Sequence, residues 1–145
     1  MDKPNGERSK LLRAIDANVN RVSEGLRVVE EVVRFILDDT DLTQKLKGMR
    51  HFVRERALEL GGSLSKLVAA RESEADAGRR LSTSDSSQRK DAAGIVAANI
   101  KRAQEGIRVL EELSASFDAG SSNRFKELRF ELYSLEKEII GRLRE

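Results

Sequence analysis

The sequence predicts an all-α fold, a helical bundle of two related helical hairpins joined by a polar loop. Three observations lead to this prediction. Charged residues make up 36% of the 145 residues and aromatic residues only 4%. The chain has a single proline, Pro4. Residues 17–31 recur in similar form 81 positions further along, at 98–112. This composition favours helices and disfavours sheet proteins, which are rich in turns and in β-branched or aromatic residues.

The first hairpin is predicted at about residues 8–61. Apolar residues recur there at the three- and four-residue spacing of one helix face. They are Ile15, Val19, Val22, Leu26, Val29, Val33 and Ile36. Polar residues at 38–41 interrupt the pattern, and Thr40 or Asp41 is the expected N-cap of the next helix. That helix is expected to end at the glycine pair 61–62, because glycine is favoured just beyond a helix C-terminus.

Residues 62–88 are predicted to form the connecting loop, rich in Ser, Asp, Arg and Gly, with one short helix from Leu64 to Ala70. A loop of this length in a compact domain is usually either functional or disordered. Two interpretations therefore stay open. The segment is a flexible linker, or it folds over a site between the hairpins.

The second hairpin is predicted at about residues 89–145, so that the chain forms a single domain over 1–145. Its first apolar stripe is Ile95, Ile100, Ala103, Ile107, Leu110 and Leu113. Residues 118–123 are expected to turn the chain. The stripe that follows is Phe125, Leu128, Leu132, Leu135, Ile139 and Leu143.

The repeat itself predicts a pseudo-two-fold relation between the hairpins. ANVNRVSEGLRVVEE and ANIKRAQEGIRVLEE are identical at nine positions, and similarity resumes at LKGMRH (46–51) and FKELRF (125–130). A mid-helix glycine costs roughly 1 kcal/mol relative to alanine. Gly25 and Gly106 occupy equivalent positions, which indicates close approach of another backbone or of a ligand. In the structural interpretation, the two long helices cross at these glycines.

Polar residues also recur in the repeat, and they suggest a binding site. Asn18, Arg21, Asn99 and Arg102 flank the apolar stripes. Arginine there can bind phosphate in a bidentate manner, and a nearby carboxylate could hold Mg²⁺ together with water. The candidate metal ligands are Asp16, Glu24 and Asp76. The structural alternative is that these Asn and Arg side chains satisfy helix ends or pair with glutamates.

Other charged residues of the repeat receive a structural interpretation. The spacing of Arg27 and Glu31, and of Arg108 and Glu112, predicts surface ion pairs one helical turn apart. Glu30 is assigned to the same structural group.

The composition excludes several chemistries. With no cysteine, the chain has no thiol nucleophile, disulfide or thiolate metal site. His51 is the only histidine, which excludes a two-histidine metal site, and it is interpreted as structural. No apolar run is long enough to span a membrane, and the N-terminus has no apolar leader, so a cytoplasmic location is expected. A net charge of +2 with mixed signs argues against nucleic acid as the ligand.

The duplicated motif resembles that of a helical domain family found alone or fused ahead of thiamine-phosphate synthase in some bacteria. The likeness spans about Arg13 to Lys137. Its further matching pieces are Arg50-His51, the loop from Arg71 to Asp76 and Gly78, Arg89, and Arg129 with Tyr133. The chain departs from the family pattern at Glu72 and Ala77, and Asp16 has Ala97 as its counterpart in the second repeat.

The resemblance implies a hydroxymethylpyrimidine-phosphate kinase of thiamine biosynthesis, which transfers phosphate from ATP to the pyrimidine monophosphate with the help of Mg²⁺. Asp76 would then be the catalytic base. The residues that would bind phosphate or substrate are Asn18, Arg21, Arg71, Asn99 and Arg102. The alternative is a non-catalytic helical module that dimerises or docks onto thiamine-phosphate synthase. The third reading, a helical nucleic-acid binder, is weakened by the scarcity of aromatic residues.

Overall fold

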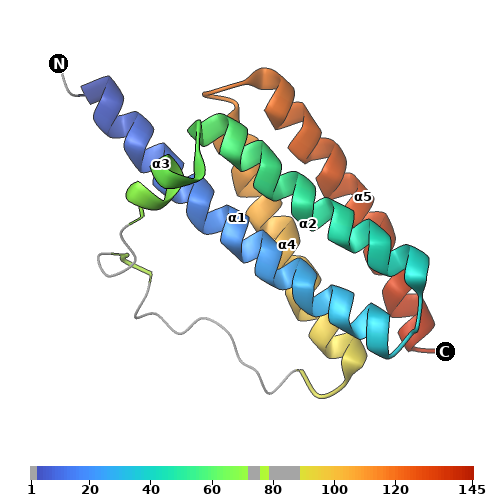
Figure 1. Ribbon diagram of the computed structural model, residues 1–145. Helices are drawn as coiled ribbons and strands as arrows, with labels where there is room; N and C mark the ends of the chain where they lie inside the picture. The colour runs from blue at the N-terminus through green and yellow to red at the C-terminus, as the bar shows by residue number, and fades with distance from the viewer. Residues whose placement is uncertain (1–2, 72–75, 79–88) are drawn as a thin grey trace.

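The computed structural model describes residues 3–71, 76–78 and 89–145, and within these ranges all regular structure is helical. The helices are α1 (Lys3–Phe35), α2 (Thr40–Gly61), α3 (Leu64–Ala69), α4 (Ala92–Ser114) and α5 (Ala119–Leu143). α1 and α2 form one hairpin, and α4 and α5 form the other (Figure 1). The predicted all-α bundle is therefore confirmed. The short helix predicted in the loop 62–88 is α3, and much of the remaining loop lies outside the described residues.

Helices α1 and α4, which carry the repeated motif, pack against each other at the centre of the bundle. α2 covers α1 and α5 covers α4, whereas α2 and α5 contact each other only sparsely. The predicted apolar stripes supply the core, and its largest fully buried side chains include Phe125, Ile15, Leu26, Leu46, Ile100, Ile107, Leu110 and Leu132. Ile36 is an exception at 57% exposed, because α1 ends at Phe35 and the stripe ends with it.

The paired glycines lie where α1 and α4 approach each other closely. A Cβ added to Gly25 would lie 2.7 Å from the backbone carbonyl oxygen of Asn99. A Cβ added to Gly106 would lie 2.7 Å from Cγ2 of Val22 and 3.4 Å from the carbonyl oxygen of Asn18. The predicted close approach is confirmed, and the neighbour is the facing helix.

A buried ion pair ties the two helices of each hairpin together. Glu30 of α1 accepts a hydrogen bond from Nε of Arg50 on α2 at 3.1 Å. Glu111 of α4 accepts from Nε of Arg129 on α5 at 2.8 Å. Both glutamate side chains are less than a tenth exposed. Glu30 is thus structural, as predicted, but it is buried.

The predicted surface pairs form as well. Arg27 lies 3.1 Å from Glu31, and Arg108 lies 2.7 Å from Glu112. The pseudo-two-fold relation of the hairpins stays a prediction, and these matched contacts support it.

Two helix starts differ from their predictions. α2 is capped by Asp39 rather than by Thr40 or Asp41, because Asp38 adopts a φ of 51° and brings Asp39 to the cap position, where it accepts from the amide of Leu42 at 2.8 Å. The predicted turn at 118–123 is instead the first turn of α5. Asp118 caps this helix and accepts from the amide of Ser121 at 3.1 Å, which satisfies amides that a helix N-terminus leaves unpaired.

These caps predict a pH dependence of stability. The pKa of Asp39 lies below its usual value of 3.8 because its carboxylate accepts from the amide of Leu42 and from Arg142, and the pKa of Asp118 is lowered by Ser121 and Gly120. Because the pKa of each carboxyl is lower in the folded state than in the unfolded state, the ionised caps stabilise the fold above pH 3.8. This stabilisation is lost as the pH falls through the pKa of the folded state. Thermal melts followed by circular dichroism should therefore show a falling melting temperature in this acid range.

The matched control replaces both caps by asparagine, which caps helices but does not titrate there. The Asp39→Asn/Asp118→Asn variant should lose less stability than the wild type between pH 5 and pH 3, which brackets the usual value of 3.8. Equal losses in the two proteins would show that other carboxylates account for the acid sensitivity.

Candidate functional site

A polar cleft lies along the face of α1 that meets α4 and the segment after α3. It encloses about 330 Å³ and is lined by Arg13, Asp16, Ala17, Asn20, Arg21, Glu24, Arg71, Asp76 and Arg102. Six of these residues come from α1, at the spacing that places side chains on one face of a helix. The cleft therefore runs along three turns of α1.

An ion pair holds Arg71 in this cleft. Oδ2 of Asp16 accepts from Nε of Arg71 at 2.8 Å, and Oδ1 accepts from Nη2 at 2.9 Å. The hydrogen bonds that Arg71 donates to Asp16, together with the negative charge of that carboxylate, raise the pKa of the Arg71 guanidinium above its usual value. The Asp16 side chain is only 9% exposed and that of Arg71 is 43% exposed. The carboxylate thus forms the buried end of the pair, and the guanidinium faces the cleft.

Asn18 sets the position of Arg21. Its amide nitrogen donates to the carbonyl of Ala14 at 2.8 Å, and its Oδ1 accepts from Nη1 of Arg21 at 2.8 Å. Asn18 is buried and Arg21 is exposed. Since the bonding partner of Arg21 is a neutral amide, this contact leaves the charge of Arg21 uncompensated.

The equivalent pair in α4 is arranged differently. The amide of Asn99 donates to the carbonyl of Ile95 at 2.9 Å, as its counterpart does in α1. Arg102, however, turns toward α1 and lies 3.6 Å from Glu24. Both side chains of this pair are more than half exposed, so a ligand can compete for either of them.

Asp76 lines the same cleft from the connecting segment. Its Oδ1 accepts from the amide of Gly78 at 2.8 Å, and the residue is exposed. No group of three or more metal-binding side chains occurs in the part of the chain that the structure describes. A metal ion held by one or two carboxylates there would complete its coordination with water or with oxygens of a bound ligand.

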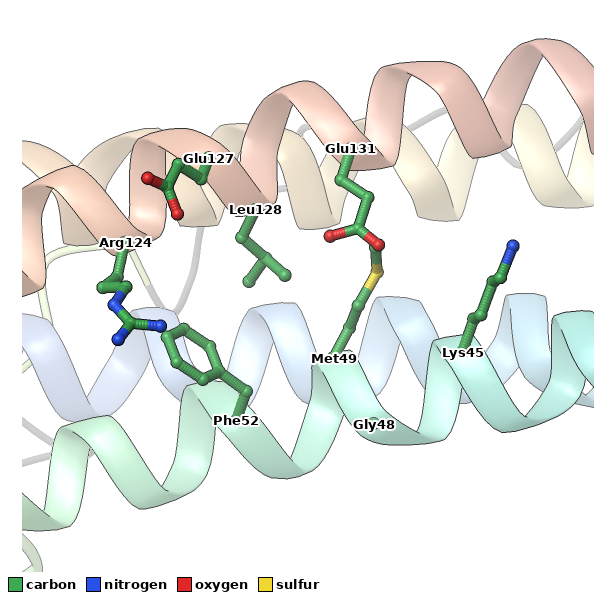
Figure 2. A pocket seen from close by; sticks show the side chains of 8 residues that line it. All are labelled: Lys45, Gly48, Met49, Phe52, Arg124, Glu127, Leu128 and Glu131. Atoms are coloured by element: carbon green, nitrogen blue, oxygen red, sulfur yellow. The ribbon is translucent and has the colours of Figure 1, made fainter.

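A second hollow, between α2 and α5, has a different character. Figure 2 shows Met49 and Phe52 of α2 and Leu128 of α5 pointing toward one another, with charged side chains at the rim. Lys45 and Arg124 on this rim are balanced by Glu127 and Glu131. The polar cleft has four arginines and three carboxylates, so it is the better site for an anion.

Comparison with known proteins identifies the family. Residues 13–138 match the ThiD2 family. The chain belongs to this family. Curated relatives are named thiamine-phosphate synthase. That of Rhodopirellula baltica is 33% identical over 93% of the chain and 36% of its own length. The protein of Synechocystis sp. is 34% identical over 90% of the chain and 36% of its own length. The protein of Synechococcus sp. strain CC9605 is 39% identical over 88% of the chain and 34% of its own length. This ThiD2 chain thus spans about a third of the length of these relatives, and no solved structure matches it.

The structure of this ThiD2 domain brings most of the predicted site residues together. Arg21, Arg71 and Arg102 line the cleft, as do the three candidate metal ligands Asp16, Glu24 and Asp76. Asn18 and Asn99 do not line it, because their amides bond to the preceding turn of their own helices. His51 lies exposed on α2, away from this cleft.

Two polar lining residues of the ThiD2 cleft were not predicted from the sequence, Arg13 and Asn20. Helical spacing provides the signal that could have found them. Arg13 precedes Asp16 by three residues and Asn20 precedes Glu24 by four, so each shares the face of a candidate residue.

None of the helices in the described ranges combines the length and the apolar character of a membrane span.

Proposed function

We propose that this ThiD2 chain is a phosphotransferase of thiamine biosynthesis that transfers the γ-phosphoryl group of ATP to hydroxymethylpyrimidine phosphate. The observation that carries the proposal is the gathering of Arg13, Arg21, Arg71 and Arg102 around one cleft. Guanidinium groups suit phosphate oxygens in both charge and geometry. The relatives named thiamine-phosphate synthase support the assignment to thiamine biosynthesis.

Such a transfer depends mainly on positioning and charge neutralisation. An oxygen of the acceptor phosphate attacks the γ-phosphorus, and the bond from the γ-phosphorus to the bridging oxygen breaks, so that its electron pair leaves with ADP. The phosphate of the acceptor is mostly a dianion at neutral pH because its second pKa is about 6. A minor fraction of the acceptor still carries one proton on this phosphate, and we assign Asp76 as the base that takes this proton. Arg21, Arg71 and Arg102 hold the phosphate oxygens and neutralise their charge.

The donor set of the cleft fits Mg²⁺ only in part. Both oxygens of Asp16 already accept hydrogen bonds from Arg71, and Asp76 is assigned as the base, so Glu24 is the carboxylate that would hold the ion. When bound together with phosphate oxygens, Mg²⁺ would supply further charge neutralisation.

The test is a kinase assay on the purified chain with ATP, Mg²⁺ and hydroxymethylpyrimidine phosphate. Arg21→Ala and Arg102→Ala are each expected to lower kcat/KM by at least about tenfold, because each removes a cation that contacts the transferring phosphate.

The chain offers matched controls in the same helices. Arg27→Ala and Arg108→Ala remove the arginine of a surface ion pair and should leave kcat/KM unchanged. A folded wild-type protein without activity would contradict the proposed function. Equal effects of the cleft and control substitutions would contradict the site assignment.

A second candidate is a helical module that acts with thiamine-phosphate synthase. It is favoured by the length comparison, since the chain corresponds to about a third of relatives that bear this name. Phe130 and Tyr133 of α5, exposed at 53% and 42%, offer an apolar contact surface. Sedimentation of the chain with a purified thiamine-phosphate synthase separates the two candidates. An inactive chain that forms a complex supports the module, and an active chain that stays uncomplexed supports the kinase.

A further inference from the structure

We propose that Asp16 is a positioning residue that presents the guanidinium of Arg71 to a phosphate group in the cleft, instead of being a metal ligand. This inference rests on the proposed function, since it takes the cleft to be the phosphate site. It assigns a role to a buried carboxylate that the transfer chemistry itself does not require.

One edge of the Arg71 guanidinium is bonded to Asp16, and the other edges are available to a ligand. Asp16 accepts one hydrogen bond from Nε and one from Nη2 of Arg71. A guanidinium has five N–H donors. Three of them remain, one on Nη2 and two on Nη1, and they lie on the edges that do not face Asp16. These donors can form a two-pronged contact with a phosphate, the geometry in which arginine binds phosphate best.

The difference in burial between the two side chains shows which of them faces the cleft. Only 9% of the Asp16 side chain is exposed, compared with 43% for Arg71. The carboxylate therefore anchors the guanidinium from the helix side, and the solvent-facing part of Arg71 is the part that lines the cleft.

The backbone of Arg71 is anchored as well. Leu67 of α3 packs so closely on Gly61 of α2 that a Cβ at Gly61 would lie 2.6 Å from Cγ of Leu67. The amide of Arg71 then donates to the carbonyl of Val68 at 3.0 Å. Arg71 is thus held at its backbone by the docked α3 and at its side chain by Asp16. Fixing an arginine rotamer before the ligand arrives reduces the entropy lost on binding.

The same contacts argue against Asp16 as a metal ligand. Both of its oxygens already accept hydrogen bonds from a cation, so a metal ion would have to use the remaining lone pairs of a side chain that is only 9% exposed, beside the positive charge of Arg71. The positioning role and the metal role therefore predict different responses to magnesium.

The experiment is calorimetric titration of the full chain, first without magnesium and then with it, using inorganic phosphate, pyrophosphate, hydroxymethylpyrimidine phosphate and ATP in separate arms. Asp16→Asn should raise the Kd for the ligand that Arg71 contacts by about tenfold, which corresponds to about 1.4 kcal/mol. The arms with the pyrimidine phosphate and with ATP distinguish the acceptor phosphate from the donor phosphates.

A double-mutant cycle tests whether Asp16 acts through Arg71. In an Arg71→Ala background, Asp16→Asn should have no further effect on Kd, whereas independent contributions would multiply. Asp16→Glu keeps the charge and should recover part of the affinity. In the kinase assay, Asp16→Asn should raise KM more than it lowers kcat. Glu31→Gln on the surface of the same helix is the matched carboxylate control.

The outcomes are distinguishable from those of the proposed function. If the wild type binds phosphate and Asp16→Asn binds it equally well without magnesium but less well with it, Asp16 is a metal ligand and the positioning role is wrong. If the wild type binds none of the ligands, both proposals are wrong. If Asp16→Asn weakens phosphate binding in a chain without kinase activity, the positioning role stands and the kinase function is wrong.

Discussion

Replacing Gly25 by alanine is expected to lower the free energy of unfolding by about 2–3 kcal/mol, at the upper end of the usual cost of overpacking a core. The added Cβ would lie 2.7 Å from the carbonyl oxygen of Asn99, and a helix backbone cannot rotate away as a side chain can. Alanine recovers roughly 1 kcal/mol of helix propensity, which offsets only part of the clash. Urea unfolding followed by far-ultraviolet circular dichroism measures the difference, and Gly25→Val should not fold.

Two other glycines serve as graded controls for this prediction. At Gly106 the carbonyl oxygen of the facing helix lies 3.4 Å from the added Cβ, compared with 2.7 Å at Gly25, and the nearest atom is a methyl carbon of Val22, so Gly106→Ala should cost less. Nothing lies within 4 Å of a Cβ at Gly48, and Gly48→Ala should stabilise the protein by about 0.5–1 kcal/mol. Equal stabilities for the Gly25 and Gly48 variants would show that α1 and α4 do not cross closely at Gly25.

Much of the fold could be predicted because burial imposes a periodic pattern on helices. The stripes of both hairpins are mostly buried, and the recurring glycines correctly indicated a close approach. The errors fall at helix ends, where single residues decide the structure. The left-handed backbone of Asp38 moves the cap of α2 to Asp39, and a serine-rich segment that resembles a turn is the first turn of α5.

The candidate site could be predicted only in part, because sequence spacing shows which face of a helix a residue occupies but not what it contacts. The recurrence of Asn18 and Arg21 pointed to the face of α1 that lines the cleft, yet the asparagine bonds to its own helix and holds the arginine. The pairing of Asp16 with Arg71 joins residues 55 positions apart. No periodicity could reveal it, because it depends on how α3 docks beside α1.

The second large effect is expected at the buried ion pair of the second hairpin. Arg129→Ala should lower the free energy of unfolding by about 3–5 kcal/mol, because it leaves the Glu111 carboxylate buried without its main partner. The Glu111 and Arg129 side chains are 8% and 15% exposed, and two hydrogen bonds join them, at 2.8 Å and 3.3 Å. Arg108 also contacts Glu111, but its side chain is half exposed, so it compensates the charge only weakly. Urea unfolding is again the measurement.

A double variant separates the charge from the packing. Glu111→Leu/Arg129→Met removes both charges and should be close to wild type in stability, because the apolar replacements need no pairing. A double variant as unstable as Arg129→Ala would show that shape, and not an unpaired charge, causes the loss.

Arg50→Ala provides an internal comparison, since Arg50 pairs with Glu30 in the first hairpin through a single hydrogen bond at 3.1 Å. If the hairpins are related by a pseudo-two-fold axis, Arg50→Ala should cost nearly as much as Arg129→Ala, and Arg108→Ala at the surface should cost less than about 1 kcal/mol.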